Sequence, residues 1–270
     1  MKLGISSFTF PWAIGGIESD HPVAMTSLEL LEHAHHLQAD VLQIADNLPI
    51  GGLSGAELTA LKAQADSYGI ALEVGTRGIK SENLENFLGI AAKLSSPILR
   101  VVIDSAGHEP TIPEIVDLLK PFESRFKDAG IKLAIENHDR LTCAEFNEII
   151  DQVGSDWVGI CLDTVNSLGA VEAPNTVIPS LAPRAINVHM KDFEIVRTNG
   201  QMGFTVRGTA LGEGRLDVAE VINAVGGPMR EITAVIELWT PRQESYEATV
   251  ALESEWAKIS VAKLRESIGS

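Results

Sequence analysis

Four side chains suited to metal binding stand at the points where short apolar runs of the sequence end. They are Glu136, Asp163, His189 and Glu237, which follow the runs K-L-A-I, I-C-L, I-N-V and A-V-I. Three carboxylates brought together would repel one another, and a divalent cation relieves that repulsion. Oxygen ligands with a single nitrogen suit Mn²⁺, Mg²⁺ or Co²⁺, and Zn²⁺ is also compatible. These four residues therefore predict a site for one divalent metal ion, with coordination positions left for a substrate.

The alternation of side chains within these runs indicates whether the four residues can converge. Residues two apart on a strand point to the same face. Asp163 shares its face with the small residues Cys161 and Gly159, and Glu136 shares its face with Ala134. The opposite faces carry bulky aliphatic residues, which suit packing under outer helices. The polar residues are therefore expected to point into the interior of a barrel.

The elements that would position these residues repeat along the whole chain. Eight short apolar runs alternate with longer helical patterns, which is typical of the α/β class. This alternation predicts a (β/α)8 TIM barrel in a single domain over residues 1–270, with its active site at the C-terminal strand ends. An open doubly wound sheet is less favoured, because neither G-x-G-x-x-G nor G-x-x-x-x-G-K-[ST] occurs. The predicted strands are Lys2–Phe8, Val41–Asp46, Ala71–Thr76, Ile98–Asp104, Lys132–Asn137, Val158–Asp163, Ala185–Asp192 and Thr233–Leu238. The predicted helices are Ser27–Leu37, Gly55–Tyr68, Glu82–Leu94, Ile112–Lys127, Cys143–Gln152, Pro174–Leu181, Val218–Val225 and Tyr246–Ser267.

Composition excludes several classes of partner. The formal net charge is -16 and no basic run occurs, so a nucleic-acid surface would work against the overall field. Two cysteines cannot make a disulfide framework, and the N-terminus has no apolar secretory segment. No run reaches the roughly 20 apolar residues of a membrane span. A cytoplasmic protein acting on a small molecule is expected, with no membrane partner.

Local sequence words carry a resemblance to a known family. The words I-E-N-H, C-L-D-T-V-N, N-V-H-M-K-D-F, G-E-G-R-L-D and V-I-E-L-W resemble the xylose isomerase-like TIM-barrel superfamily of sugar phosphate isomerases and epimerases. The resemblance implies that Glu136, Asp163, His189 and Glu237 are the metal ligands, and it leaves a homo-oligomer open. Epimerase-like members carry a histidine three residues after the aspartate, where this chain has Asn166. Their substrate contacts therefore cannot be copied without change.

Charged and aromatic residues near the predicted strand ends are candidates for substrate binding. Lys191 shares the face of His189, and Arg77 follows the third strand. A cationic pair at the mouth of an acidic barrel favours an anionic substrate such as a carboxylate or phosphate. The other predicted substrate-binding residues are His138, Asn166, Asp46 and Trp239.

The first functional prediction is an isomerase or epimerase that acts on a small polyhydroxylated keto compound. Its reaction would proceed through a metal-stabilised enediolate. In that reaction Glu136 and Glu237 would be the catalytic bases. The second is a lyase, because the words E-V-G-T-R-G, E-N-H-D-R and D-T-V-N-S resemble the branch that decarboxylates 3-oxo sugar acids such as 3-oxoisoapionate. The third is a sugar-binding protein that has lost its chemistry, which an intact ligand set disfavours.

Two further expectations concern the barrel interior and its longest connection. Glu73 and Arg100 have interior-facing positions on neighbouring strands, so a buried ion pair on the barrel floor is expected, with Asn187 completing its hydrogen bonds. The segment Phe193–Arg215 is predicted to be a long loop, and loops of that length in a compact domain often act as lids.

Overall fold

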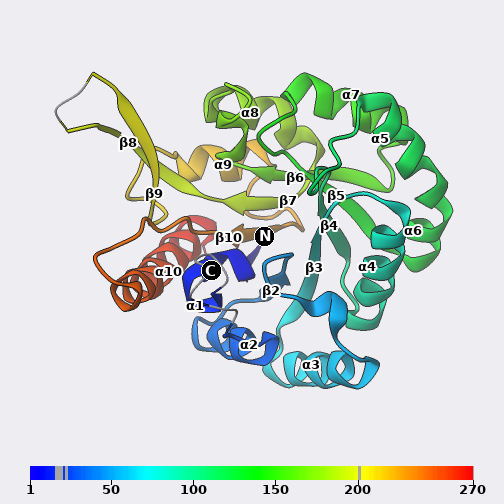
Figure 1. The fold of residues 1–270 in the computed structure, drawn as a ribbon, viewed down its shortest axis with the longest axis horizontal. Helices are drawn as coiled ribbons and strands as arrows, with labels where there is room; N and C mark the ends of the chain where they lie inside the picture. Colours follow the sequence, from blue (N-terminus) through cyan, green and yellow to red (C-terminus); the bar gives the residue numbers. More distant parts are fainter. Residues whose placement is uncertain (16–20, 22–23, 200–201, 270) are drawn as a thin grey trace.

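The strands close into a barrel, as the sequence predicts. The computed structural model describes residues 1–15, 21, 24–199 and 202–269. Eight parallel strands are hydrogen-bonded in the order β1-β10-β7-β6-β5-β4-β3-β2, and β1 pairs with both β10 and β2. Helices surround the barrel on its outside (Figure 1). The barrel strands are β1 Lys2–Ser6, β2 Val41–Ile44, β3 Ala71–Arg77, β4 Ile98–Val102, β5 Lys132–Glu136, β6 Val158–Asp163, β7 Ala185–Met190 and β10 Thr233–Ile236.

Three of the outer helices, α2, α3 and α7, begin at a capping box that the sequence supplies. A Ser or Thr side chain accepts a hydrogen bond from the N3 backbone N–H, and a Glu at N3 accepts from the cap, in the boxes Thr26/Glu29, Ser54/Glu57 and Thr142/Glu145. The predicted helix Ile112–Lys127 is divided in two by a 3-10 turn at Lys120–Phe122, because Pro121 cannot continue an α-helix. The helices are α1 Pro11–Ile14, α2 Ser27–His36, α3 Gly55–Tyr68, α4 Ser81–Leu94, α5 Ile112–Leu119, α6 Glu123–Ala129, α7 Cys143–Val153, α8 Pro174–Leu181, α9 Val218–Ala224 and α10 Tyr246–Ile268.

The connection after β7 contains a hairpin and is not the structureless loop that the sequence predicts for Phe193–Arg215, of which residues 200 and 201 lie outside the described part of the chain. Strands β8 Asp192–Arg197 and β9 Phe204–Thr209 pair antiparallel and form an arm that projects away from the barrel (Figure 1). Both strands are rich in β-branched and aromatic residues, which favour extended structure. Asp192 holds the base of the arm, because its carboxylate accepts hydrogen bonds from the backbone N–H groups of Gly212, Gly214 and Leu216 at 2.8, 3.0 and 3.0 Å.

The hydrophobic core lies between the barrel and the helices, while the barrel interior is largely polar. The outward-facing strand residues are fully buried under the helices, as Leu133, Ile135, Ile160 and Leu162 illustrate. Inside the barrel a small apolar cluster of Ile98, Ala134 and Cys161 leaves space for buried polar side chains. The interior is therefore built to hold a polar site. Among the described residues, no helix is long and apolar enough to cross a membrane.

Candidate metal centre

Strand register brings the four predicted ligands to the same end of the barrel. Glu136 and Asp163 end β5 and β6, His189 is the penultimate residue of β7, and Glu237 directly follows β10. The registers place Asp163 opposite His189. Because the strands are parallel, all four side chains start from the C-terminal edge, where barrel enzymes carry their active sites. All four are buried, with exposed fractions of 0 to 1%.

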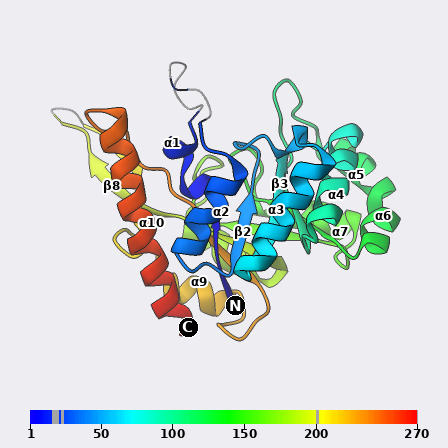
Figure 2. The same ribbon diagram turned by 90° about the horizontal axis from the view of Figure 1, so that it is seen from below.

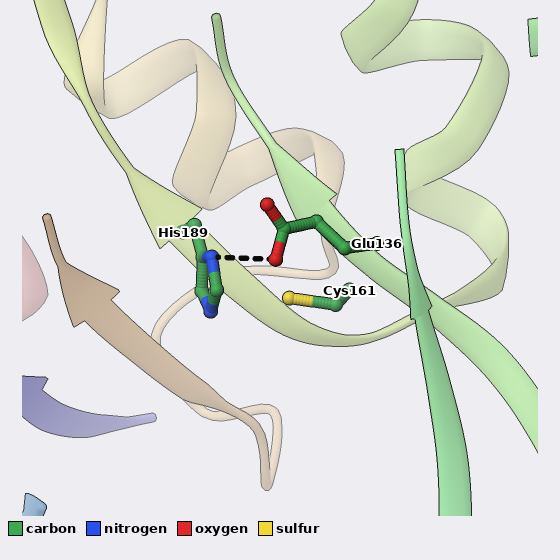
Figure 3. Close-up of side chains that lie close together, drawn as sticks. All are labelled: Glu136, Cys161 and His189. Atoms are coloured by element: carbon green, nitrogen blue, oxygen red, sulfur yellow. Dashed lines mark ion pairs between the residues drawn. The ribbon is translucent and has the colours of Figure 1, made fainter. Parts of the chain in front are cut away.

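His189 lies at the centre of the cluster. Its Nδ1 atom is 3.3 Å from Glu136 Oε2, 3.3 Å from Glu237 Oε1 and 3.9 Å from Asp163 Oδ2. Figure 3 shows His189, Glu136 and Cys161 converging from three strands, with the second ring nitrogen of His189 turned away from the glutamate. Ligand atoms of Asp163, His189 and Glu237 all lie within 4.8 Å of one another, as do those of Glu136, Cys161 and His189. The barrel therefore contains a buried His/Glu/Asp/Cys cluster that could hold a metal ion.

The hydrogen bonding of the cluster fits a divalent cation. His189 Nδ1, Asp163 Oδ2 and Glu237 Oε2 are buried and have no hydrogen-bond partner among the described residues. Lys191 Nζ approaches the two oxygens at 2.8 and 2.9 Å as an ion pair, without the angles of a hydrogen bond. Buried polar atoms are nearly always satisfied, so three such atoms turned toward one another are the donor set that a cation would complete.

Cationic neighbours keep the glutamates of the cluster ionised. Burial by itself raises the pKa of Glu136, but the charges of Arg100 and His189 outweigh it and hold that pKa well below its ordinary value. Burial also opposes ionisation of Glu237, yet His189 and Lys191 lower its pKa to about 2. Ionised carboxylates are the form that binds a metal ion.

Two predicted substrate-binding residues contact the ligands directly. Asn166 donates a hydrogen bond from Nδ2 to Glu136 Oε1 at 2.8 Å, and its Oδ1 accepts one from Lys191 Nζ at 3.3 Å. Lys191 is 14% exposed and pairs with Asp163 and Glu237. Both side chains therefore border the cluster where a substrate would approach it.

The other charged candidates form a separate group at the mouth. Asp46 bridges two guanidinium groups, with Arg77 Nε at 3.2 Å and Arg100 Nη1 at 2.9 Å. Arg77 Nη2 is 3.5 Å from His138 Nε2, and both residues line a cavity of about 480 Å³. Because both oxygens of Asp46 already accept from an arginine, its position suits orienting Arg77 better than binding a substrate hydroxyl.

Trp239 lies where the hairpin leaves the barrel. Its Nε1 donates to the backbone oxygen of Asp192 at 3.0 Å, and a Cβ on Gly208 would fall 2.4 Å from its ring. The side chain is 36% exposed. The structure thus gives Trp239 a packing contact with the arm, and its predicted contact with a substrate stays a prediction.

The predicted floor ion pair of Glu73 and Arg100 is wrong. Arg100 instead forms ion pairs with Glu136 and Asp46 at the C-terminal side. Glu73 accepts hydrogen bonds from Gln43, Asn187 and Thr233. The long Arg100 side chain extends toward the C-terminal strand ends, where two carboxylates contact its guanidinium group. Two carboxylates stabilise that buried charge more than the single carboxylate of Glu73 would.

Sequence reasoning missed two residues that touch the cluster. Gln43 Oε1 is 2.7 Å from His189 Nε2, and Ser6 Oγ donates to Glu237 Oε1 at 3.0 Å. A polar residue inside an apolar strand was the available signal, because the runs V-L-Q-I and L-G-I-S each contain one. Cys161 matches its expected role as a small interior residue: burial raises the pKa of its thiol to about 11, so it stays neutral.

Comparisons with known proteins agree with this fold. The chain is 34% identical to 3-oxo-isoapionate decarboxylase of Pectobacterium atrosepticum over 97% of its own length and 94% of the relative's. Its fold is similar to that of a D-psicose 3-epimerase crystallised in the presence of D-fructose, with a TM-score of 0.73, 18% identity and full coverage of both chains. It is also similar to a xylose isomerase-like TIM barrel protein from Mycobacterium smegmatis in complex with magnesium, with a TM-score of 0.67, 15% identity and 97% coverage of both chains.

A family model described as xylose isomerase-like TIM barrel matches residues 31–260, which include all four predicted ligands. The closed eight-stranded barrel has the architecture that this description names. The chain therefore belongs to the xylose isomerase-like TIM barrel family.

Proposed function

We propose that this protein is a divalent-metal-dependent decarboxylase of a 3-oxo sugar acid, with 3-oxoisoapionate as the first substrate to test. The observation that carries the proposal is the 34% identity to 3-oxo-isoapionate decarboxylase along 97% of the chain. The sequence motifs alone favour an isomerase or epimerase, and this relative reverses that preference.

In this proposal Glu136, Asp163, His189 and Glu237 hold one divalent ion. This assignment is supported by His189 Nδ1, Asp163 Oδ2 and Glu237 Oε2, which are buried and have no hydrogen-bond partner among the described residues. When bound, the ion supplies electrophilic stabilisation of the negative charge that develops on substrate oxygens. The oxygen-rich ligand set suits Mn²⁺, Mg²⁺ or Co²⁺, and Zn²⁺ remains compatible.

The reaction breaks the bond between the substrate carboxylate and the carbon next to the ketone. The electron pair of that bond passes to the ketone oxygen, CO₂ leaves, and the carbon of the resulting enolate takes up a proton that comes from solvent water. Cationic side chains at the mouth would hold the carboxylate before cleavage. Arg77, whose Nε lies 3.2 Å from Asp46, and Lys191, which is 14% exposed beside the cluster, are our candidates for this role.

The environment of Glu136 also favours decarboxylation over proton abstraction. Asn166 donates to its Oε1 at 2.8 Å, and Arg100 donates to its Oε2. A carboxylate held by both oxygens is a well-positioned ligand, whereas an isomerase or epimerase needs one that can take a proton from carbon. Decarboxylation needs no such base.

An isomerase or epimerase is the second candidate, because Glu136 and Glu237 stand on both sides of His189, each with an oxygen 3.3 Å from its Nδ1. Two carboxylates flanking a reacting carbon are what epimerisation requires. A non-catalytic sugar-binding protein is the third, and it would tolerate loss of a ligand.

One assay separates the three. The protein with Mn²⁺ is incubated in D₂O with a 3-oxo sugar acid or with a neutral ketose, and CO₂ release and deuterium incorporation are both measured. We expect CO₂ from the acid and no deuterium in recovered ketose. Deuterium in the ketose without CO₂ from the acid would favour the isomerase, and sugar binding without either product would favour the binder.

A further inference from the structure

We propose that Gln43 is a positioning residue for the metal centre, because its amide dictates which nitrogen of His189 faces the carboxylates. The inference deepens the proposed function, since it rests on the metal site described there. Gln43 lies on β2 and His189 on β7, which are not neighbouring strands, so their contact crosses the barrel interior. Both side chains are 0% exposed, and Gln43 Oε1 lies 2.7 Å from His189 Nε2.

The orientation of the Gln43 amide is fixed by the hydrogen bonds that its nitrogen atom donates. Gln43 Nε2 donates to Glu73 Oε2 at 3.0 Å and to Asn187 Oδ1 at 3.1 Å. Flipping the amide would place its oxygen against these two oxygen acceptors, and both hydrogen bonds would become repulsive contacts. In a buried site such a loss is not compensated by water.

Glu73 and Asn187, which accept these hydrogen bonds from Gln43 Nε2, are themselves held in place. Asn187 Nδ2 donates to the same Glu73 Oε2 at 3.0 Å, so its own oxygen must face Gln43. Thr233 Oγ1 donates to the other oxygen of Glu73 at 2.7 Å. Glu73 is 3% exposed and serves as the acceptor that orders both amides. No cation among the described residues forms an ion pair with Glu73, and these hydrogen bonds hold its buried carboxyl group in place.

The fixed amide decides the tautomer of His189. Gln43 Oε1 can only accept, so Nε2 must carry the ring N–H. In the neutral ring, which is the form that ligates a metal ion, Nδ1 is then the nitrogen with a free lone pair, and it is turned to Glu136 and Glu237 at 3.3 Å each. Figure 3 shows this nitrogen directed at Glu136 and the other directed away. Ligating histidines are commonly oriented by such a partner on the second nitrogen.

The first test is metal affinity in Gln43→Leu, measured by calorimetry with Mn²⁺ and with Zn²⁺. We expect affinity to fall about 10- to 100-fold, the range seen when the partner of a ligating histidine is removed. Thr233→Val is the matched control, because it also removes one hydrogen bond from Glu73 but leaves Oε2 and both amides in place. We expect the control to bind both ions as the wild type does. Gln43→Leu with wild-type affinity would overturn the proposal.

The second test follows the ring N–H without relying on the ion. In ¹⁵N-labelled protein, we expect a downfield, exchange-protected Nε2–H proton of His189 in the wild type and in Thr233→Val, with and without Zn²⁺. It should be lost or shifted upfield in Gln43→Leu. A proton found on Nδ1 of the Zn²⁺-loaded wild type would overturn the proposal. A wild type that binds neither ion but keeps the protected Nε2–H would refute the metal centre and the proposed function instead.

Discussion

At the scale of single residues, the charges of the centre are arranged in pairs that cross between strands. Lys191 of the β7 end contacts Asp163 of β6 and Glu237 of β10 at 2.8 and 2.9 Å. Arg100 of β4 contacts Glu136 of β5. Each carboxylate thereby keeps one cationic neighbour, which limits the repulsion within the cluster.

Replacing Glu237 by Gln tests the ligand set. The change removes one negative charge from the centre while keeping the shape of the side chain. We expect Mn²⁺ affinity to fall by about 100-fold or more and CO₂ release to be lost, because a neutral amide is a far weaker ligand. Calorimetry and the CO₂ assay measure both effects. Glu266→Gln, which alters an exposed pair with Lys263, is the control; a Glu237→Gln protein with wild-type affinity would exclude Glu237 as a ligand.

Replacing Arg77 by Ala tests the anion-binding role. Losing a charge-assisted hydrogen bond costs about 1.5–3 kcal/mol, so we expect KM for a 3-oxo sugar acid to rise roughly 10- to 100-fold. The value of kcat should change less, because Arg77 is not among the ligands. Arg125→Ala is the control, since Arg125 pairs with Glu85 on the outer surface, where both are about half exposed. Steady-state kinetics with an unchanged KM would remove Arg77 from the substrate pocket.

At the scale of elements, helix α10 is tied to the segment after β1. Glu253 of α10 is 0% exposed, and its two oxygens accept from the backbone N–H groups of Trp12 and Ala13 at 2.9 Å each. Figure 2 shows α1 beside the upper part of α10. Helix α10 therefore also holds the short helix α1 that follows β1.

This contact predicts a pH dependence of stability. Burial raises the pKa of Glu253 to about 7, although the two backbone N–H groups oppose the rise. Between the ordinary value of 4.5 and this raised value, the folded protein keeps a proton that the unfolded chain releases. Its contribution to the free energy of unfolding is thus full below pH 4.5 and is lost as the pH rises to 7.

Glu253→Gln measures that contribution. Urea denaturation at several pH values gives the free energy of unfolding of the wild type and of the variant. The value for the variant is then subtracted from that for the wild type at each pH. We expect the difference to shift against the wild type by at most about 3 kcal/mol between pH 4.5 and 7. A difference that is constant over this range would show that Glu253 titrates normally.

At the scale of the whole molecule, we expect the fold not to depend on a bound ion. The main hydrophobic core runs around the barrel between strands and helices, while the four predicted ligands meet inside it at one end. A net charge of -16 also favours cations near the protein. Ion binding should therefore add stability to a barrel that is already folded.

Thermal unfolding with and without Mn²⁺ tests this relation. An ion at 100 times its Kd stabilises the folded state by about 2.7 kcal/mol, which for a chain of this size corresponds to roughly 5–10 °C in Tm. We expect a cooperative transition after EDTA treatment, and a rise of that order when Mn²⁺ is restored. The Glu237→Gln protein should show no rise. An EDTA-treated wild type that is unfolded at 25 °C would contradict the expectation.

The sequence by itself determined the barrel and the four side chains that converge in it. Eight alternating runs sufficed for the fold, because parallel strands with helical crossovers have few ways to bury their apolar faces. Glu136, Asp163, His189 and Glu237 could be found because parallel strands end on one edge, so position within a strand predicts position in space. The position of a residue within its own strand is a local property, so it can be read from the sequence.

Only the tertiary structure decided which residues meet across the barrel. Strand alternation predicts a pair of Arg100 with Glu73, whereas Arg100 reaches Asp46 and Glu136 in the structure, and the same pattern gives no sign that Gln43 contacts His189. Such contacts depend on the tilt and stagger of closed strands and on the length of each side chain, which no alternation pattern contains. The hairpin after β7 was missed for a related reason, since antiparallel pairing depends on which partner strand is near.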